Sequence, residues 1–305
     1  MTSRLHIMPQ GDAELLAGLR EQGADIVGHD EQPAGIIVTG MFKKLNLTEV
    51  LEANPQVRWV QLPSAGIELY AEILTRFPDL TWTSAKGSYA KPVGEHALAL
   101  TLAALRGLKV RALASSWGTE GGISLNGLRC VVVGGGGVAA EIVRLYKAFD
   151  THVTVVRRTA EPVEHADVTV AFDGLDEALK GAEVVALAAA ATPTTRHLLN
   201  ADRLALLAEG AVVANVGRGS LVDQAALVEA LTTGTLRGAG LDVTDPEPLP
   251  ESDPLWSLEN CLITPHTADT TEMVVPLLRE RILANHRRFT AGEPMLGLVD
   301  PAQGY

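Results

Sequence analysis

The chain has 305 residues, of which 47% are hydrophobic and 20% are charged, so its composition is globular rather than disordered or collagen-like. Its formal net charge of −12 disfavours nucleic acid and anionic membrane surfaces as partners, although a local group of arginines can still bind a small anion. Two cysteines in apolar runs, Cys130 and Cys261, are too few for a disulfide framework or a zinc site. We therefore expect reduced thiols and no metal. Because the sequence also lacks a signal-peptide pattern and a membrane-length apolar run, we expect a cytoplasmic protein.

Short apolar runs that are typical of strands alternate with helical patterns in the first part of the chain. Strands are predicted at 5–8, 35–38 and 58–62, and helices at 12–21 and 47–53. Because strands that alternate with helices usually pair in parallel, this region predicts an α/β layer with helices on both faces of a sheet. A longer helix is predicted to begin near Pro92, since proline suits the first helical turn.

A second series of strands and helices follows that long helix. Its six predicted strands lie at 130–133, 153–156, 184–187, 211–215, 239–243 and 261–264. The helices between them are predicted at 138–147, 175–180, 201–207 and 224–231. Six parallel strands match a complete doubly wound dinucleotide-binding fold. A last helix, predicted at 272–290, is expected to pack back on the first domain.

A glycine-rich turn follows the first strand of this second series. Gly134 would permit the tight turn, Gly136 would let the backbone approach a pyrophosphate, and Ala139 replaces the usual third glycine. The N–H groups of Gly137 and Val138 would then point at the phosphates from a helix N-terminus. The alternative is a merely flexible glycine run, but the position between a strand and a helix favours cofactor binding.

The second strand of this series ends in two arginines, Arg157 and Arg158. An NAD site has an acidic residue here that holds the ribose 2′-hydroxyl. Guanidinium groups bind phosphate instead, and the missing carboxylate removes the repulsion that would exclude a 2′-phosphate. We therefore expect NADP to be preferred, with NAD possible. The alternative is a pair of solvated surface arginines.

Three polar side chains follow the last three predicted strands. Arg218, Glu247 and His266 each lie past the carboxyl end of a strand, which is where ligands bind in parallel sheets. Reduction of a carbonyl by hydride needs a proton donor for the oxygen and a cation for a substrate carboxylate, and a histidine and an arginine could supply them. Each residue taken singly has an ordinary structural explanation, and only their combination points to catalysis.

The motifs of the chain resemble those of the D-isomer-specific 2-hydroxyacid dehydrogenases, a family that includes glyoxylate/hydroxypyruvate reductases and phosphoglycerate dehydrogenases. The resemblance runs along essentially the whole chain and rests on the segments PSAGIE (63–68), VGEHALAL (93–100), LNGLRCVVVGGGGVA (125–139), TPTTRHLLN (192–200), ANVGRGSLVDQAAL (214–227), GAGLDVTDPEPLPESDPLW (238–256), NCLITPH (260–266) and GEPMLGLVD (292–300). The NVGRG, EPLP and TPH motifs, in that order, are the specific part of the resemblance.

The resemblance implies a role for each residue of the site. His266 would be the proton donor in reduction and the base in oxidation, Glu247 would orient it and favour its charged form, and Arg218 would bind the 2-oxo acid. Other residues with implied roles are Asp242 and the Val216 backbone, for the nicotinamide carboxamide, and Ala65 and Gly66, whose N–H groups would cradle the substrate carboxylate.

Three residues depart from the pattern of the family. Ala190 stands where proline is usual, Gly94 stands where alanine is usual, and Asp269 stands where glycine or serine is usual. The carboxylate of Asp269 follows the predicted catalytic histidine closely and could alter cofactor contacts or the choice of substrate.

We therefore predict two Rossmann- or flavodoxin-like domains, each a doubly wound parallel sheet, with a cleft between them. Residues 1–94 and 270–305 would form the flavodoxin-like substrate domain, and residues 95–269 the dinucleotide-binding Rossmann domain. The predicted activity is NADPH-dependent reduction of a small 2-oxo acid such as glyoxylate or hydroxypyruvate to a D-2-hydroxy acid. The resemblance also implies a homodimer. The alternatives are an NAD(P)-sensing, corepressor-like binding protein without turnover, a phosphoglycerate dehydrogenase-like enzyme and a formate dehydrogenase-like enzyme.

Overall fold

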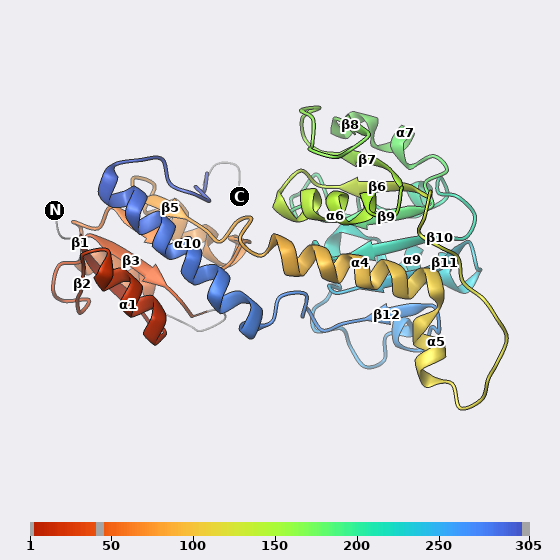
Figure 1. Ribbon diagram of the computed structural model, residues 1–305, viewed down its shortest axis with the longest axis horizontal. Coiled ribbons are helices and arrows are strands. Elements are labelled where there is room, and N and C mark those ends of the chain that lie inside the picture. Colours follow the sequence, from red (N-terminus) through yellow and green to blue (C-terminus); the bar gives the residue numbers. More distant parts are fainter. Residues whose placement is uncertain (1–2, 41–45, 301–305) are drawn as a thin grey trace. The chain divides into compact units, whose positions relative to one another are not determined.

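The computed structural model describes residues 3–40 and 46–300 (Figure 1). The chain forms two compact units. Unit 1 comprises residues 1–89 and 271–305, and unit 2 comprises residues 90–270. Each unit is built around its own parallel sheet, and each is described by itself below.

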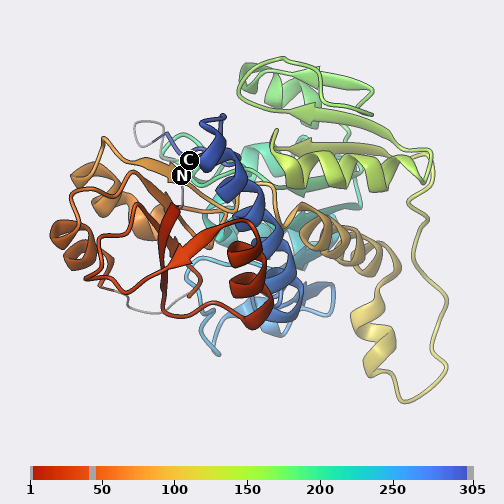
Figure 2. The same ribbon diagram turned by 60° about the vertical axis from the view of Figure 1, so that its left-hand side comes forward.

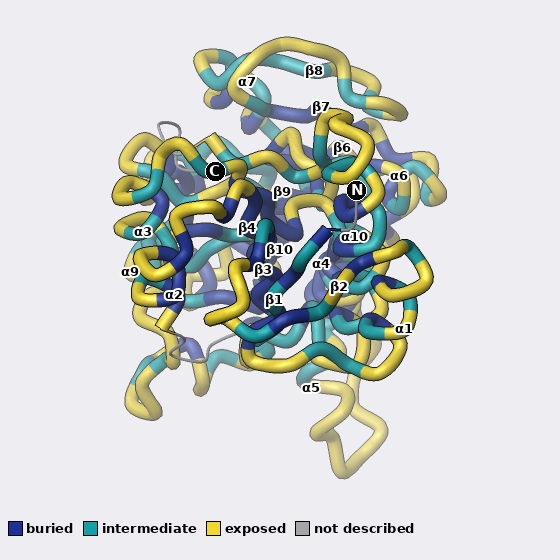
Figure 3. Tube along the Cα trace, turned by 90° about the vertical axis from the view of Figure 1, so that its left-hand side faces the viewer, coloured by how far each residue is buried: buried dark blue, intermediate teal, exposed yellow. Residues whose placement is uncertain are grey.

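Unit 1 contains a five-stranded parallel sheet in the order β2-β1-β3-β4-β5, which is the flavodoxin-like order. The strands are β1 (Ser3–Met8), β2 (Ala24–Ile26), β3 (Gly35–Val38), β4 (Trp59–Gln61) and β5 (Thr81–Thr83). The three predicted strands correspond to β1, β3 and β4. The prediction missed β2 and β5, because each has only three residues and mixes polar with apolar side chains. Figure 3 shows how thoroughly the central strands β3 and β4 are buried.

The helices of unit 1 are α1 (Ala13–Glu21), α2 (Leu47–Ala53), α3 (Ala71–Arg76) and α10 (Thr271–Ala291). Asp12 caps α1 by accepting a hydrogen bond from the Leu15 N–H at 2.9 Å. The last helix, α10, lies beside α1 although some 250 residues separate them (Figure 2). Its Asn285 donates to Gln61 Oε1 at 2.8 Å, so a buried hydrogen bond joins this helix to the sheet.

Unit 2 contains a seven-stranded parallel sheet in the order β12-β11-β10-β9-β6-β7-β8. The strands are β6 (Arg129–Val133), β7 (His152–Val156), β8 (Val168–Val170), β9 (Val184–Leu187), β10 (Ala211–Asn215), β11 (Leu236–Leu241) and β12 (Cys261–Ile263). The prediction of six strands is therefore wrong by one, because it missed β8, a three-residue edge strand that is only partly buried. The first six strands along this chain still follow the dinucleotide-binding order, with β12 added at the far edge.

The helices of unit 2 are α4 (Ala90–Arg106), α5 (Leu108–Leu113), α6 (Gly137–Lys147), α7 (Leu175–Leu179), α8 (Ala201–Leu204) and α9 (Gln224–Thr232). The long helix α4 packs on α6 and on the sheet. A Cβ at Gly94 would lie 2.6 Å from Glu141 Cγ, which explains why a residue smaller than alanine stands here. The fold class is thus confirmed as two parallel-sheet α/β domains.

No helix in residues 3–40 and 46–300 combines the length and the apolar character needed to span a bilayer.

Candidate active site

The three predicted catalytic residues follow three adjacent strands of unit 2. Arg218 comes after β10, Glu247 after β11 and His266 after β12, and these strands are neighbours at one side of the parallel sheet. The carboxyl ends of neighbouring parallel strands meet at one edge, so the topology brings the three loops together. Arg218 itself precedes a short 3₁₀ helix at Gly219–Leu221.

The loops after β10 and β11 touch directly at Gly219. A Cβ on Gly219 would lie 1.9 Å from the carbonyl carbon of Thr244, so only glycine fits at this contact. Asn215 braces the same turn: its Oδ1 accepts from the Gly217 N–H at 3.0 Å and its amide donates to the Arg218 carbonyl at 2.9 Å. The position of the Arg218 backbone is therefore fixed by the sheet and by the neighbouring loop.

His266 and Glu247 form a short polar contact in the site. The distance from His266 Nδ1 to Glu247 Oε1 is 2.5 Å, and both side chains are about two-fifths exposed. His266 has a φ of 48°, a left-handed conformation that non-glycine residues rarely adopt. Its backbone N–H donates to the Asp242 carbonyl at 2.9 Å, which helps to hold the residue in this conformation. One imidazole nitrogen is thus engaged by a carboxylate, and the other, Nε2, is the one available for proton transfer to a substrate.

Asp242 organises the loop that carries His266. Its buried carboxylate accepts hydrogen bonds from Thr264 Oγ1 at 2.5 Å and from the N–H groups of Thr267 at 2.9 Å and Ala268 at 3.1 Å. His96 of α4 lies 3.3 Å away. Burial alone would raise the pKa of Asp242, but the hydrogen bonds from His96, Thr264 and the two N–H groups outweigh it and hold the pKa below its usual value.

His96 is a site residue that the sequence analysis missed. Its Nε2 lies 2.9 Å from Thr264 Oγ1, so it links α4 to the loop after β12. The residue lies within the VGEHALAL segment that contributed to the resemblance, but a single histidine in a helix gives no sign of a partner 168 positions away.

Asp269 is the third residue after His266, and its carboxyl interacts electrostatically with two of the predicted catalytic residues, His266 and Arg218. Its half-buried carboxyl has a raised pKa, because burial outweighs the attraction of His266 and Arg218, and Asp242 adds repulsion. This residue is therefore a further ionisable group in the loops at the same edge of the sheet.

The glycine turn has the geometry that a dinucleotide requires. Gly134 has a φ of 137°, and a Cβ there would lie 2.6 Å from the Ala188 carbonyl oxygen. Gly136 is the N-cap of α6 without a side-chain cap, and a Cβ on it would meet open space. Helix α6 begins at Gly137 and continues through Val138, and Ala139 is fully buried in its first turn. The backbone can therefore be approached closely at the positive end of α6, as a pyrophosphate would need.

Arg157 and Arg158 follow directly after β7, beside this turn. The Arg157 side chain covers Gly135, since a Cβ on Gly135 would lie 2.6 Å from Arg157 Nε. Arg157 also pairs with Glu161 at 3.3 Å, and Arg158 is exposed. The guanidinium group of Arg157 thus lies against the glycine turn. This is the position where the sequence predicts a side chain that binds the 2′-phosphate of NADP.

The two predicted substrate-binding residues of the first domain belong to unit 1. Ala65 and Gly66 lie in the loop after β4, where Ser64 Oγ donates to the Gly66 carbonyl at 2.6 Å. Ala65 is exposed and Gly66 is half-buried. The remaining predicted residues, including the buried Val216, belong to unit 2.

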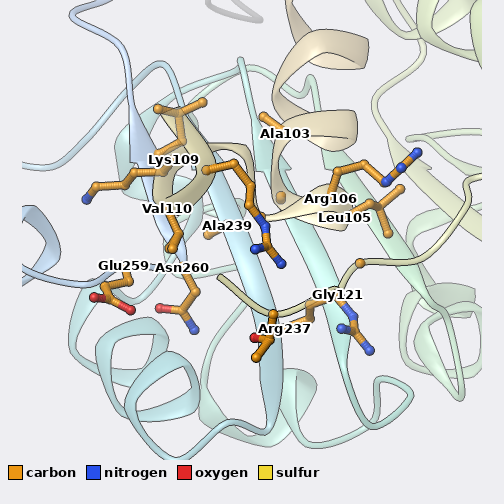
Figure 4. A pocket seen from close by; sticks show the side chains of 16 residues that line it. Ala103, Leu105, Arg106, Lys109, Val110, Gly121, Arg237, Ala239, Glu259 and Asn260 are labelled. Atoms are coloured by element: carbon orange, nitrogen blue, oxygen red, sulfur yellow. The ribbon is translucent and has the colours of Figure 1, made fainter. Parts of the chain in front are cut away.

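A hollow of about 510 Å³ in unit 2 contains none of the predicted site residues. It lies where α4 ends and α5 begins, near the start of β11, and Figure 4 shows Arg106, Lys109 and Arg237 around it. Lys109 has a structural role, because its Nζ donates hydrogen bonds to the carbonyls of Trp256, Leu258 and Cys261. The catalytic candidates lie instead at the carboxyl ends of the strands.

Comparison with known proteins decides the family. The profile described as D-isomer specific 2-hydroxyacid dehydrogenase, NAD binding domain, matches residues 98–268, which is more than half of the chain. This chain belongs to the D-isomer specific 2-hydroxyacid dehydrogenases. The predicted family is thereby confirmed, and with it the assignment of the chain as an NAD(P)-dependent enzyme.

Individual members of the D-isomer specific 2-hydroxyacid dehydrogenases and related proteins match over most of the chain. An uncharacterized protein of Corynebacterium melassecola is 37% identical over 82% of this chain and 84% of its own length. The glyoxylate reductase of Pyrococcus furiosus is 30% identical over 84% of this chain and 80% of its own. A solved D-isomer specific 2-hydroxyacid dehydrogenase from Xanthobacter autotrophicus, in complex with NADPH and MES, is 28% identical over the whole of both chains, with a TM-score of 0.85.

Proposed function

We propose that this dehydrogenase is an NADPH-preferring reductase of small 2-oxo acids, of the glyoxylate or hydroxypyruvate type, and forms D-2-hydroxy acids. The observation that carries the proposal is the 2.5 Å contact between His266 Nδ1 and Glu247 Oε1, beside the braced loop of Arg218. The similarity to the glyoxylate reductase of Pyrococcus furiosus supports the substrate class.

In this proposal the chain supplies three functions around a 2-oxo acid. Arg218 binds the carboxylate and polarises the carbonyl, since a guanidinium group pairs with planar anions in two hydrogen bonds. His266 delivers a proton from Nε2 to the carbonyl oxygen as that oxygen gains charge, and Glu247 keeps the imidazole oriented. The backbone N–H groups of Ala65 and Gly66 are the proposed second contact to the substrate carboxylate.

The nicotinamide cofactor supplies the hydride when it is bound. The turn at Gly134, Gly136 and Gly137, with Val138 and Ala139 at the start of α6, would hold its pyrophosphate. Arg157 and Arg158 would hold the 2′-phosphate of NADP, and the NADPH-bound relative from Xanthobacter autotrophicus supports that preference.

Asp242 and the backbone of Val216 are the proposed contacts to the nicotinamide carboxamide. The contacts that Asp242 already makes add a second proposed role. By fixing the N–H groups of Thr267 and Ala268, its carboxylate positions the loop that carries His266.

A panel of 2-oxo acids, each assayed with NADPH and with NADH, tests the proposal. We expect the highest kcat/KM with glyoxylate or hydroxypyruvate and NADPH, and a product of D configuration by chiral chromatography. Binding of NADPH without consumption of the cofactor with any of the acids would overturn the proposal.

We also propose that the enzyme is a homodimer that associates mainly through unit 2. Helix α5 and the segment after it expose an unusual group of large apolar side chains, namely Leu108, Val110, Leu113 and Trp117. Such a group marks an association surface. Sedimentation equilibrium should give the mass of two 32.3 kDa chains, and Leu113→Asp combined with Trp117→Ser should give one. A monomeric wild type would contradict this part of the proposal.

The cytoplasm remains the proposed location. Cys130 and Cys261 are free and buried, and burial raises the pKa of both thiols to about 12, which suits reduced structural residues. Fractionation of cells with an antibody against the chain tests the location.

A further inference from the structure

The loop after β4 in unit 1 contains two adjacent backbone N–H groups that no protein group binds. Among the residues that the structure describes, neither the N–H of Ala65 nor that of Gly66 donates a hydrogen bond to a protein acceptor. Ala65 is exposed and Gly66 is half-buried, so a ligand can reach this segment. Consecutive N–H groups of this kind bind anionic groups such as carboxylates. The loop therefore has the donors that a carboxylate needs.

The carbonyl groups around these donors are held from inside the unit. The Pro63 carbonyl accepts a hydrogen bond from Tyr89 Oη at 2.5 Å, and the Ser64 carbonyl accepts one from the Ala85 N–H at 2.9 Å. The Gly66 carbonyl accepts from Ser64 Oγ at 2.6 Å. The loop thus directs these carbonyls toward the protein and leaves its N–H groups for a ligand.

The planarity of the peptide bond links the bound carbonyls to the unbound N–H groups. In a trans peptide unit the C=O and the N–H point in opposite directions. The Ser64 carbonyl and the Ala65 N–H belong to one trans unit, so the hydrogen bond from Ala85 directs the Ala65 N–H away from Ala85. Tyr89 holds the preceding unit through its carbonyl. The direction of the donors therefore depends on hydrogen bonds made to their neighbours.

Tyr89 is well placed to fix the loop. Its side chain is buried, with 4% of its surface exposed, and Pro63 is buried as well. A buried carbonyl that loses its donor is not compensated by water, so the loop would have to shift to find another partner. Tyr89 is also the last residue of unit 1, since α4 and unit 2 both begin at Ala90. The loop is therefore tied to the point where the chain leaves unit 1.

We propose that Tyr89 is a positioning residue for substrate binding. Through the Pro63 carbonyl it holds the loop in the arrangement that presents the N–H groups of Ala65 and Gly66 to the carboxylate of a 2-oxo acid. The inference rests on the proposed function, in which these two N–H groups contact that carboxylate. A contact of this kind exists both before and during hydride transfer, so its loss changes KM more than kcat.

The test compares steady-state kinetics with glyoxylate and hydroxypyruvate, at saturating NADPH, in the wild type and in Tyr89→Phe. We expect Tyr89→Phe to raise KM for both acids by about tenfold, which is the scale of one charge-assisted hydrogen bond, and to keep kcat within about twofold. The affinity for NADPH should not change. Tyr89→Met, whose flexible apolar side chain fills the same space without a hydroxyl, repeats the test independently of how phenylalanine packs.

Two further variants separate positioning from stability. Tyr146→Phe is the matched control, because Tyr146 is also buried and its hydroxyl lies 2.5 Å from Thr101 Oγ1, but it belongs to unit 2. This control should leave KM unchanged even where it lowers the melting temperature. Ser64→Ala removes the hydrogen bond to the Gly66 carbonyl and should raise KM as Tyr89→Phe does.

The contrary outcomes can be told apart. If Ser64→Ala raises KM and Tyr89→Phe does not, or if Tyr89→Phe lowers kcat alone, the loop does not need Tyr89 to bind substrate and the inference is wrong. If neither variant changes KM in an active enzyme, Ala65 and Gly66 do not bind the carboxylate, so the inference fails while the reductase activity stands. If the wild type reduces neither acid, the proposed function itself fails.

Discussion

The two units share a parallel-sheet architecture but bury their polar groups for different purposes. In unit 1 the buried polar side chains, such as Gln61, Thr83 and Asn285, join α10 to strands β4 and β5 on one side of the sheet. In unit 2 the buried charged residue is Asp242, at the carboxyl end of β11, and it organises the loop of His266. The same fold therefore uses buried polarity to complete a domain in one unit and to hold the loop of the proposed proton donor in the other.

The largest effect should follow the loss of a proposed catalytic side chain from the site of unit 2. We expect His266→Ala and Arg218→Ala each to lower kcat by about a thousandfold, because each removes an interaction that strengthens as the carbonyl oxygen gains charge. Steady-state kinetics and NADPH titration measure the two properties separately, and cofactor affinity should stay within a few-fold of the wild type. His152→Ala, on an exposed position of β7, is the control. Loss of NADPH binding in either site variant would instead indicate a structural role.

The next effect concerns the cofactor edge of unit 2. Replacing Arg157 and Arg158 together by alanine should lower the affinity for NADPH by about thirtyfold, or about 2 kcal/mol of binding free energy, since hydrogen bonds to a phosphate are charge-assisted. The affinity for NADH should change by less than about threefold, as measured by calorimetry. Arg144→Ala removes a positive charge from the neighbouring helix α6 and is the matched control. An equal loss for both cofactors would contradict the assignment of the 2′-phosphate.

In unit 1 the corresponding loss should appear in stability rather than turnover. Asn285→Leu leaves Gln61 Oε1 and the backbone of Leu296 without their amide partners, which should cost about 1–3 kcal/mol of unfolding free energy. Urea denaturation followed by tryptophan fluorescence reports on this unit, because Trp59 and Trp82 are buried in it. Asn126→Leu, at an exposed position of unit 2, is the control. A change of less than about 0.5 kcal/mol would show that the buried network contributes little.

The smallest effect should be the response of unit 1 to mild acid. Burial, with a minor contribution from nearby Arg287, holds the pKa of His286 below its ordinary value of 6.5. As the pH falls below 6.5, the unfolded chain binds a proton that the folded chain does not, so the unfolding free energy decreases until the folded pKa is passed. We expect a loss of at most about 1.4 kcal/mol for each tenfold difference in proton affinity. Urea denaturation at pH 7 and pH 5.5 measures it, and His286→Gln should abolish this part of the pH dependence. A wild type with equal stability at both values would refute it.

The sequence predicted what local pattern encodes and missed what depends on distant partners. Strands such as 184–187, whose residues are all apolar, and the turn at Gly134 stand out along the chain, and so do the loops of Arg218 and His266 after their strands. Strand β8 has only three residues and is defined by its parallel pairing with β7, so no local sequence pattern predicts it. The contact of His96 with Thr264 joins a helix to a loop far along the chain, and the Asp242 hydrogen bonds depend on the turn after β12.

The contact between Gly219 and Thr244 has a consequence for how this enzyme can diversify. Because no side chain can be added at residue 219, the two loops cannot be remodelled one at a time, and a change in either requires a compensating shift in the other. Directed evolution toward new acids should therefore accumulate substitutions elsewhere and leave the 217–219 turn unaltered.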